Sequence, residues 1–416
     1  MHSTNIAIAD IQKLAWSDPV HGQVALPKRP LILTGGFGSG LSIRKGDPPG
    51  RLWAVCDRGP NFKIKVAIKR YGLGLFEAYE GPKSAKIMPS VDIGPAMAEL
   101  QVEDDRIVLL RTIPIANREG KAISGLPIPS GTHAQCEPAL DLQGNVIPPD
   151  PEGIDSEGLT ALFDGSFWVS DEYGPSLLRV DAAGEVIERL MPEGVALEGA
   201  HYSCRQVLPA IAAKRQLNRG FEAISVSPSE QRLFLAFQSP LAHPDEEAHE
   251  RGRHVRIWRL SGDASSVEAQ YLYPLDAPES FVRDAAKAPL EPSDLKVSEI
   301  AALGEEALLV LERGSDTTKI YRVDLADDCA LAAKHLDKET RPTVEEMSGR
   351  GSLDLPVLAK ALLFTTDHAP EVAADLEGMV ILSPTELLLV NDNDFGVEGA
   401  ETSFWRVRFE QPVLRP

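Results

Sequence analysis

The chain has 416 residues, 43% of them hydrophobic, and a formal net charge of -20 at neutral pH. These values are typical of a folded globular protein with a large core. The excess of acidic residues argues against nucleic acid or an anionic membrane as a partner, since both attract basic surfaces. The sequence has no run of about eighteen apolar residues, so we also expect no membrane insertion.

The N-terminal region and the cysteines bear on the cellular compartment. Residues 1–30 lack a basic segment followed by an apolar one, so the sequence as given predicts no signal peptide and a cytoplasmic protein, unless a leader has been trimmed. The four cysteines are widely spaced and form no C-x-x-C motif, which favours free core thiols over disulfides. They are Cys56, Cys136, Cys204 and Cys329.

The first recurring pattern in the chain is a pair of short apolar strands bordered by polar residues. It covers residues 38–43 and 52–60, and its second strand ends in Asp57 and Arg58. Residues 125–153, rich in Pro and Gly, then join the first pattern to the second. A stretch of this length inside a compact fold indicates a functional loop over one face rather than a domain linker.

The second copy of the pattern is the clearest. The motif Asp-Ser-Glu-Gly-Leu at 155–159 and the strand at 167–175 flank Phe-Asp-Gly-Ser at 163–166, a turn that predicts an antiparallel hairpin. The start of the first strand then lies beside the end of the second. Glu157 and Asp171 should therefore emerge at the same edge of the sheet.

Three further copies follow in the order of the chain. They pair residues 220–224 with 233–238, 297–300 with 308–314, and 376–380 with 387–394. Two copies depart from the acidic pattern, because the first has Ser39 in place of Glu and the third ends in Gln238. Segments 207–217 and 356–364 have helix-forming composition with apolar spacing of three to four, so we expect helical insertions there.

Most of these hairpins continue into a third amphipathic strand, and the second continues into a fourth at 185–188. Four-stranded units recurring every seventy or so residues predict an all-β fold, a β-propeller of five to six four-stranded blades with short helical insertions. We expect one domain over residues 1–416, with recognisable repeats within 36–409. A sixth blade would come from the N-terminal strand region and residues 107–113.

Propeller geometry gathers the repeated acids at one mouth of the central channel. Converging carboxylates repel one another unless a cation lies among them, and a ring of oxygen ligands suits calcium better than zinc. The alternative for each glutamate is a structural role, in which it accepts backbone N–H groups. The predicted acidic rim consists of Asp57, Glu157, Asp171, Glu172, Glu222, Glu299, Glu312, Glu377, Asp392 and Asp394.

Roles can be assigned within this rim and beside it. The expected metal ligands are Asp57, Glu157, Asp171, Glu222, Glu299, Glu377, Asp392 and Asp394, and the expected catalytic residues are Glu157, Asp171, Glu172 and Asp392. Substrate contacts are expected from Arg58, Arg313, Tyr173 and Asn393, since guanidinium groups bind phosphate oxygens in pairs. The alternative for both arginines is an ion pair with the glutamate of the adjacent blade.

The motifs DSEGL with FWVSDEYGP, NRGFEAI, VSEI with LLVLERG, and LEGM with LLLVNDNDFG resemble those of the phytase-like β-propellers, the family named for the esterase-like activity of phytase. The resemblance covers most of residues 36–409. It implies phosphoric ester hydrolysis, with the repeated acids as the catalytic or calcium-binding set, in a family whose members are often exported. Ser39 and Gln238 depart from that pattern and weaken the expectation of a full multi-metal cluster.

The leading hypothesis is therefore a monomeric, calcium-dependent phosphoric ester hydrolase acting on a small anionic substrate. One alternative is a non-catalytic propeller that binds a metal or ligand or docks a protein, and a weaker one is a calcium-dependent lactonase. The number of bound ions distinguishes them. The sequence has no R-H-G-x-R-x-P, G-x-S-x-G, Walker A or H-E-x-x-H motif.

Overall fold

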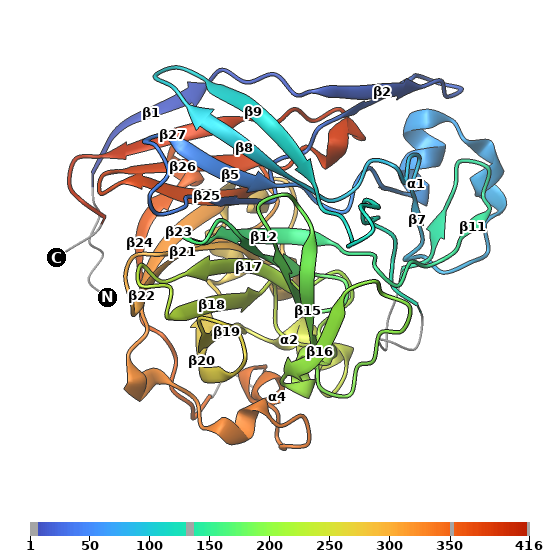
Figure 1. Cartoon of the computed structure of the whole chain (residues 1–416). Coiled ribbons are helices and arrows are strands. Elements are labelled where there is room, and N and C mark those ends of the chain that lie inside the picture. Colours follow the sequence, from blue (N-terminus) through green and yellow to red (C-terminus); the bar gives the residue numbers. More distant parts are fainter. Residues whose placement is uncertain (1–6, 130–136, 350–352, 414–416) are drawn as a thin grey trace.

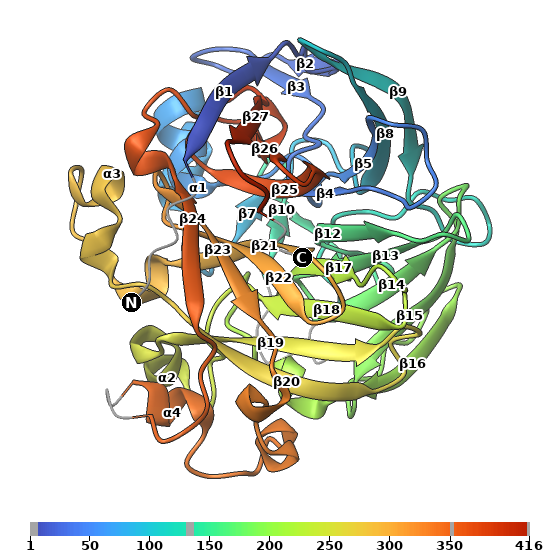
Figure 2. The same cartoon turned by 90° about the vertical axis from the view of Figure 1, so that its left-hand side faces the viewer.

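The computed structural model describes residues 7–129, 137–349 and 353–413. Five antiparallel sheets of these residues are arranged around a common axis, as Figures 1 and 2 show. The sheets are blade 1, β4 (Gly40–Ser42), β5 (Arg51–Val55), β8 (Ala96–Val102) and β9 (Ile107–Pro114); blade 2, β12 (Ser156–Ala161), β13 (Phe167–Asp171), β14 (Ser176–Val180) and β15 (Val186–Pro192), with β16 (Ser203–Leu208) added in parallel; blade 3, β17 (Phe221–Val226), β18 (Arg232–Phe237), β19 (His254–Ser261) and β20 (Val267–Pro274); blade 4, β21 (Lys296–Ala302), β22 (Ala307–Arg313), β23 (Thr318–Asp324) and β24 (Lys360–Thr365); and blade 5, β25 (Leu376–Ser383), β26 (Glu386–Asn391), β27 (Phe404–Phe409) and β1 (Ile8–Leu14).

The blades form a closed ring. The innermost strands β4, β12, β17, β21 and β25 each contact the next, and β25 returns to contact β4. The N-terminal strand β1 pairs with β27, so the two ends of the described chain complete one blade. The predicted all-β propeller is confirmed, with five blades in the described residues. The strands considered for a sixth blade are used otherwise, since β9 is the outer strand of blade 1 and β1 closes blade 5.

The core lies between neighbouring blades. Strand β22 illustrates why the strands read as continuous apolar runs, because Leu308 to Leu311 are all fully buried. A blade inside a propeller packs against a neighbour on both faces, so alternation with polar residues is lost. Between blades 1 and 2, the rings of Trp53 and Phe167 pack edge to face with their centroids 4.9 Å apart.

Of the two predicted helical segments, the first is confirmed in part and the second is wrong. Residues 207 and 208 end β16, and only Ala210–Lys214 form a short 3-10 helix. Residues 360–365 form β24, the outer strand of blade 4, which pairs with β23. The apolar run in this second segment fits either period, and pairing with an available sheet edge decides for the strand. The α-helices are short: α1 (Ile64–Val66), α2 (Glu246–Arg251), α3 (Val282–Ala285) and α4 (Val344–Ser348).

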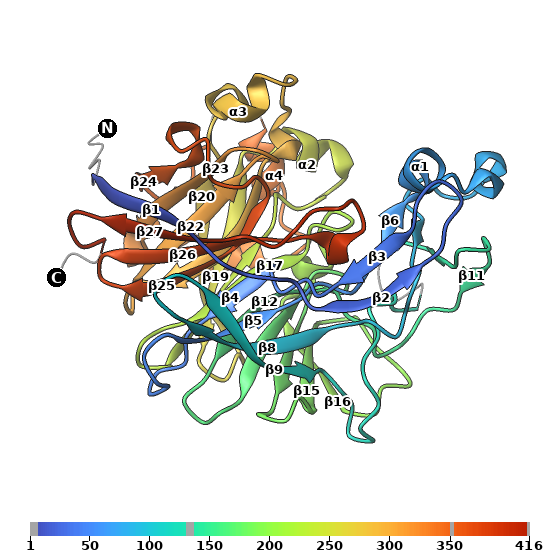
Figure 3. The same cartoon turned by 90° about the horizontal axis from the view of Figure 1, so that it is seen from above.

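A small sheet projects beside the ring, as Figure 3 shows from above. It consists of β6 (Phe62–Lys63), β7 (Lys86–Ile87), β10 (Ala139–Leu140) and β11 (Val146–Ile147). Strands β10 and β11 belong to the loop predicted at 125–153, of which residues 130–136 lie outside the described residues. Separately, β2 (Val20–Val24) and β3 (Leu31–Thr34) form a hairpin.

Two expectations about the chain as a whole can be compared with the structure. In the described residues, no helix is long and apolar enough to cross a membrane. Cys56, Cys204 and Cys329 are free thiols, as expected, whereas Cys136 lies outside the described residues.

Candidate active site

The inner strands share an irregularity near their first residues. In β12, β17, β21 and β25 the pairing register skips one residue, and a bulge of this kind turns the extra side chain out of the ladder. The skipped residues are Glu157, Glu222, Ser298 and Glu377. The three glutamates therefore point out of their sheets at equivalent positions of blades 2, 3 and 5.

A second set of equivalent residues follows the partner strands directly. The first residue of each inner strand pairs with a residue of the second strand, and the residue after that partner is Glu172 in blade 2, Gln238 in blade 3 and Asp392 in blade 5. In blade 1, Asp57 lies shortly after the end of β5. Both sets line one cavity of about 290 Å³, which we call the mouth cavity. It is lined by Asp57, Arg58, Asn61, Phe62, Lys63, Lys86, Glu157, Glu172, Asn218, Glu222, Gln238, Lys296, Asp375, Glu377, Asp392, Asp394 and Glu398.

Asp171 is not among the residues that line the mouth cavity. It pairs with Ser156 inside the sheet and has no exposed surface. Its carboxylate accepts a hydrogen bond from Arg189 Nη2 at 2.6 Å, from Ser176 Oγ at 2.7 Å and from the backbone N–H of Asp155 at 2.9 Å. Asp171 thus holds the strand entry in place, behind the cavity.

Glu299 occupies a different position from the other predicted glutamates. In blade 4 the skipped residue is Ser298, so Glu299 is equivalent to Gly158 and Gly378. Its side chain crosses the channel and accepts the N–H of Leu41 in β4 at 3.2 Å and that of Ile300 at 3.0 Å. Burial raises the pKa of Glu299 well above its usual range. The structure thus gives it the backbone-accepting role that was the alternative.

Glu312 is also turned away from the mouth cavity. It accepts hydrogen bonds from Tyr273 Oη at 2.6 Å and Lys360 Nζ at 2.5 Å, in the polar layer between blades 3 and 4. Its position in the sheet matches that of Asp171, one residue before the cavity-facing position. Strand alternation therefore turns Asp171 and Glu312 away from the cavity.

Arg58 lines the mouth cavity but is already paired. Its Nη2 lies 2.7 Å from Asp155 Oδ2 of the next blade, and its Nη1 lies 2.8 Å from Glu137 Oε2. Its guanidinium also stacks on the ring of Tyr173, 4.7 Å from the centroid, and Tyr173 Oη donates to Glu137. Tyr173 is 4% exposed, so it supports Arg58 from below the cavity surface.

Arg313 and Asn393 are internal as well. Arg313 is 1% exposed and pairs with Asp375 and Glu377, so the alternative of an ion pair with the adjacent blade describes its geometry. Asn393 Oδ1 accepts the N–H of Phe395, and its Nδ2 donates to Gly35 O at 2.9 Å. Asn393 therefore shapes the β26–β27 loop rather than lining the cavity.

Two groups of carboxylates, in the mouth cavity or directly behind its wall, have oxygens within 4.8 Å of one another. One is Asp57, Asp155 and Glu157, and the other is Asp57, Asp392 and Asp394. Ligand oxygens on one Ca²⁺ ion, at about 2.3–2.6 Å each, lie at most about 5 Å apart. Asp392 Oδ1 and Asp155 Oδ1 are buried and receive no hydrogen bond from a described residue. These all-oxygen groups therefore fit a hard divalent cation such as calcium.

The pKa values of the cavity carboxyl groups are raised by burial and by the neighbouring carboxylates. Burial, followed by the nearby Asp155, raises the pKa of Asp57 well above its usual range. Burial and the charge of Glu222 raise the pKa of Glu172 to about 8, and burial with Glu377 raises that of Glu222 to about 7. A cation among these groups would relieve both the repulsion and the cost of burying charge.

Sequence reasoning missed several residues at the mouth cavity. Asp155 is fully buried behind the cavity wall, with a carboxylate oxygen within 4.8 Å of those of Asp57 and Glu157. It stands in the quoted motif, but the pattern drew attention to Glu157 alone. Lys296 begins β21 in the position of Asp155 and Asp375, and alignment of the repeats would have shown it. Lys86 and Lys63 come from the small side sheet, where nothing repeats, so only the folded structure brings them to the cavity.

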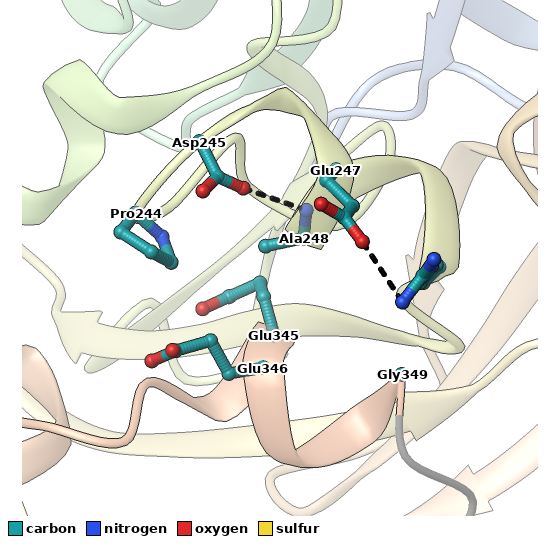
Figure 4. A pocket seen from close by; sticks show the side chains of 8 residues that line it. Pro244, Asp245, Glu247, Ala248, Glu345, Glu346 and Gly349 are labelled. Carbon is teal, nitrogen blue, oxygen red and sulfur yellow. Dashed lines mark hydrogen bonds and ion pairs between the residues drawn. The ribbon is translucent and has the colours of Figure 1, made fainter.

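A second pocket of about 230 Å³ lies between α2 and α4, and Figure 4 shows the interactions that engage two of its acids. Asp245 accepts the N–H of Ala248, and Glu247 pairs with Arg251. Glu345 binds Arg256 at 2.8 Å, while Glu346 caps its own helix. The mouth cavity differs because Glu172 Oε1, Glu222 Oε2 and Asp392 Oδ1 are buried and receive no hydrogen bond from a described residue, which makes it the candidate active site.

Fold and site together define a five-bladed β-propeller with an acidic cavity at one mouth of its channel. The Phytase-like family, described as "Esterase-like activity of phytase", matches residues 32–395, and the chain belongs to this family. This places it among propellers described by a hydrolytic activity. An uncharacterised secreted protein of Arthroderma benhamiae is 25% identical over 338 residues, which cover 69% of this chain and 62% of that protein. The match thus spans less than two thirds of that relative.

Solved propellers are more distant. The aldose sugar dehydrogenase of Streptomyces coelicolor is 11% identical, with 97% of this chain and 100% of that chain covered and a TM-score of 0.34. A gluconolactonase of Xanthomonas campestris is 9% identical, with 95% and 99% covered and a TM-score of 0.30.

Proposed function

We propose that this chain is a calcium-dependent phosphoric ester hydrolase that acts as a monomer on a small anionic substrate at the mouth cavity. The observation that carries the proposal is the convergence of five carboxylates from four blades on one solvent-connected cavity. They are Asp57, Glu157, Glu222, Glu377 and Asp392. Two of them, Glu222 and Asp392, have a buried oxygen that receives no hydrogen bond from a described residue. Membership of the Phytase-like family supports an ester as the substrate class.

The residues divide into cation ligands and groups that move protons. Asp57, Glu157, Asp392 and Asp394 supply the ligand oxygens. When bound, Ca²⁺ supplies Lewis-acid polarisation of the phosphoryl oxygens and an activated water. Glu172 is 1% exposed and lines the same cavity, and burial with the charge of Glu222 raises its pKa to about 8 in the metal-free protein, which favours its protonated form. It can therefore donate a proton to the leaving alcohol.

Lys296 is the best-placed cation for the substrate's negative charge. It lines the mouth cavity from blade 4, where Ser298 and Arg313 replace the acids of the other blades. Its amine makes no hydrogen bond or ion pair with a described residue, whereas Arg58 and Arg313 are both engaged by carboxylates. Lys296 can therefore bind a phosphoryl oxygen, while the two arginines hold the acidic side chains in place.

The secreted relative supports export for this chain, in place of the cytoplasmic location expected from the sequence as given. Fractionation of the source cells, with detection of the native protein, tests this point. Protein found only inside the cells would contradict it.

The activity test is phosphate release from a panel of phosphomonoesters and phosphodiesters by protein treated with chelator and then supplied with calcium. We expect release only with calcium, and a loss of at least tenfold in kcat for Glu172→Gln, since removing a general acid costs about 10²–10⁴-fold. A folded protein that releases no phosphate from any ester would contradict the proposal. Activity on lactones instead would favour the lactonase alternative.

A further inference from the structure

We propose that the mouth cavity binds two divalent cations side by side, with Asp57 as a ligand common to both. One ion is held by Asp57, Asp155 and Glu157, and the other by Asp57, Asp392 and Asp394. The inference deepens the proposed function and rests on it for the identity of the cation. It replaces the broad ring of ligands expected from the sequence with two defined groups.

The first step is the placement of the two groups. Each contains three carboxylates whose oxygens lie within 4.8 Å of one another, and Asp57 belongs to both. A carboxylate has two oxygens and can bridge neighbouring ions, so one side chain satisfies both groups. Two ions about 3.5–4 Å apart are a recurrent arrangement in enzymes that cleave phosphoric esters.

The second step is that each group contains a buried carboxylate oxygen without a donor. Asp155 has no exposed surface, and its Oδ1 receives no hydrogen bond from any residue in the described parts of the chain. Asp392 is 9% exposed, and its Oδ1 is likewise without a donor, whereas its Oδ2 accepts the N–H of Asp394 at 2.8 Å. A buried carboxylate oxygen with no partner is costly, and a cation is the ligand that removes this cost.

The third step is that the surrounding chain fixes both groups in advance. Arg58 Nη2 holds Asp155 Oδ2 at 2.7 Å and leaves Oδ1 for a ligand. The N–H of Asp155 is itself bound by Asp171. On the other side, the Asp392 carboxylate fixes the turn that carries Asp394. Each group thus has one rigid member, one bulge or turn residue, and the common Asp57.

The two groups of cation ligands lie on one side of the cavity. All their ligands come from blades 1, 2 and 5, while blade 3 contributes Glu222 and Gln238 and blade 4 contributes Lys296 to the remaining wall. A substrate phosphate between the two walls would meet the cations on one side and the Lys296 amine on the other. The neutral and basic residues that break the repeat therefore lie where an anionic substrate needs them.

The experiment is a calorimetric titration of CaCl₂ into chelator-treated full-length protein, with bound ions counted independently by equilibrium dialysis. We expect two ions per chain in the wild type, and one in Glu157→Gln and in Asp394→Asn, with the affected site weakened at least tenfold. Asn suits position 394 because that residue has a φ of 46°, which Asn tolerates. Asp57→Asn should weaken both sites.

The matched control is Glu398→Gln, which removes the same charge from the same cavity but belongs to neither group. It should retain two ions, because loss of general negative potential is a small effect beside loss of a ligand. Circular dichroism and thermal unfolding confirm that each variant is folded. Should Asp57→Asn fail to fold, the two single-site variants still decide the question.

One ion in the wild type, or two in both single-site variants, would overturn the inference. So would equal loss in Glu398→Gln, which would indicate diffuse attraction rather than two sites. These outcomes are separate from the activity test. Two ions without phosphate release would leave the two-ion site standing and remove the proposed hydrolysis, whereas phosphate release with a single ion would overturn only the two-ion site.

Discussion

Asp171 and Arg189 form an ion pair in which neither side chain has any exposed surface. Breaking such a pair by removing one partner costs about 3–5 kcal/mol, since the remaining charge stays buried. We therefore expect Asp171→Asn to lower the free energy of unfolding by about this amount in urea titrations. It should also weaken calcium binding, because Asp171 holds the N–H of Asp155.

The control for Asp171→Asn is Glu103→Gln, which breaks the exposed pair with Arg106 and should change stability by less than about 1 kcal/mol. The comparison also tests the catalytic role predicted for Asp171 from the sequence. If Asp171→Asn keeps its stability and calcium affinity but loses hydrolysis, a direct catalytic role would replace the positioning role.

At the scale of strands, the repeat predicted the blades well but placed side chains only to within one residue. The hairpins, the outer strands and the turn at 163–166 follow from local pattern, because alternation and turn chemistry are written in the sequence. The bulges are not. A one-residue shift moves a side chain to the other face, which is why Glu299 leaves the mouth while Glu157 and Glu222 enter it.

The side chains contributed by non-repeating elements were beyond sequence reasoning for a different reason. Lys63 and Lys86 reach the cavity through strands of two residues each, paired across large sequence separations. Such short strands carry no period. The convergence of Glu157, Glu222 and Glu377 was predictable because propeller symmetry places equivalent positions at one mouth. The cations that accompany them depend on insertions and on the irregular fourth blade.

The glycine that follows Glu157 allows neighbouring inner strands to approach closely. A Cβ atom on Gly158 would lie 2.6 Å from the carbonyl oxygen of Glu222 in the next blade. Gly158→Ala should therefore push β12 and β17 apart and cost about 1–3 kcal/mol, the usual range for overpacking. Denaturant unfolding measures this cost.

Gly304→Ala is the matched control for Gly158→Ala, since a Cβ there meets nothing within 4 Å and the backbone is not left-handed. It should be neutral or stabilise the fold by less than about 1 kcal/mol. Equal effects of Gly158→Ala and Gly304→Ala on stability would show that β12 and β17 can accommodate a methyl group at position 158. The close approach of these strands would then not explain the glycine at that position.

For the whole molecule, the acidic cavity should make the stability of the metal-free protein fall as the pH rises. Burial raises the pKa of Glu172 to about 8 and those of Glu222 and Glu377 to about 7, all above the value of about 4.3 in an unfolded chain. A raised carboxyl pKa in the folded state means that folding favours the protonated form. The stability it contributes is complete below about pH 4 and is lost as the pH rises through 7 to 8.

We therefore expect the Tm of chelator-treated protein to decrease between pH 5 and pH 8, and calcium to restore it most strongly at pH 8. A ligand at one hundred times its Kd stabilises the folded state by about 2.7 kcal/mol, so the recovery should be measurable by calorimetry. Lys296 limits the pH range over which the stability should decrease. Arg313 and burial lower the pKa of Lys296 to about 8, and above that pH its deprotonation in the folded state opposes the loss of stability. In Glu172→Gln, the Tm of the metal-free protein should fall less at the upper end of this pH range. Calcium should still raise the Tm of this variant. A metal-free Tm that stays level from pH 5 to pH 8 would mean that the cavity carboxylates are not crowded in solution, and that the molecule needs no cation to hold its mouth together.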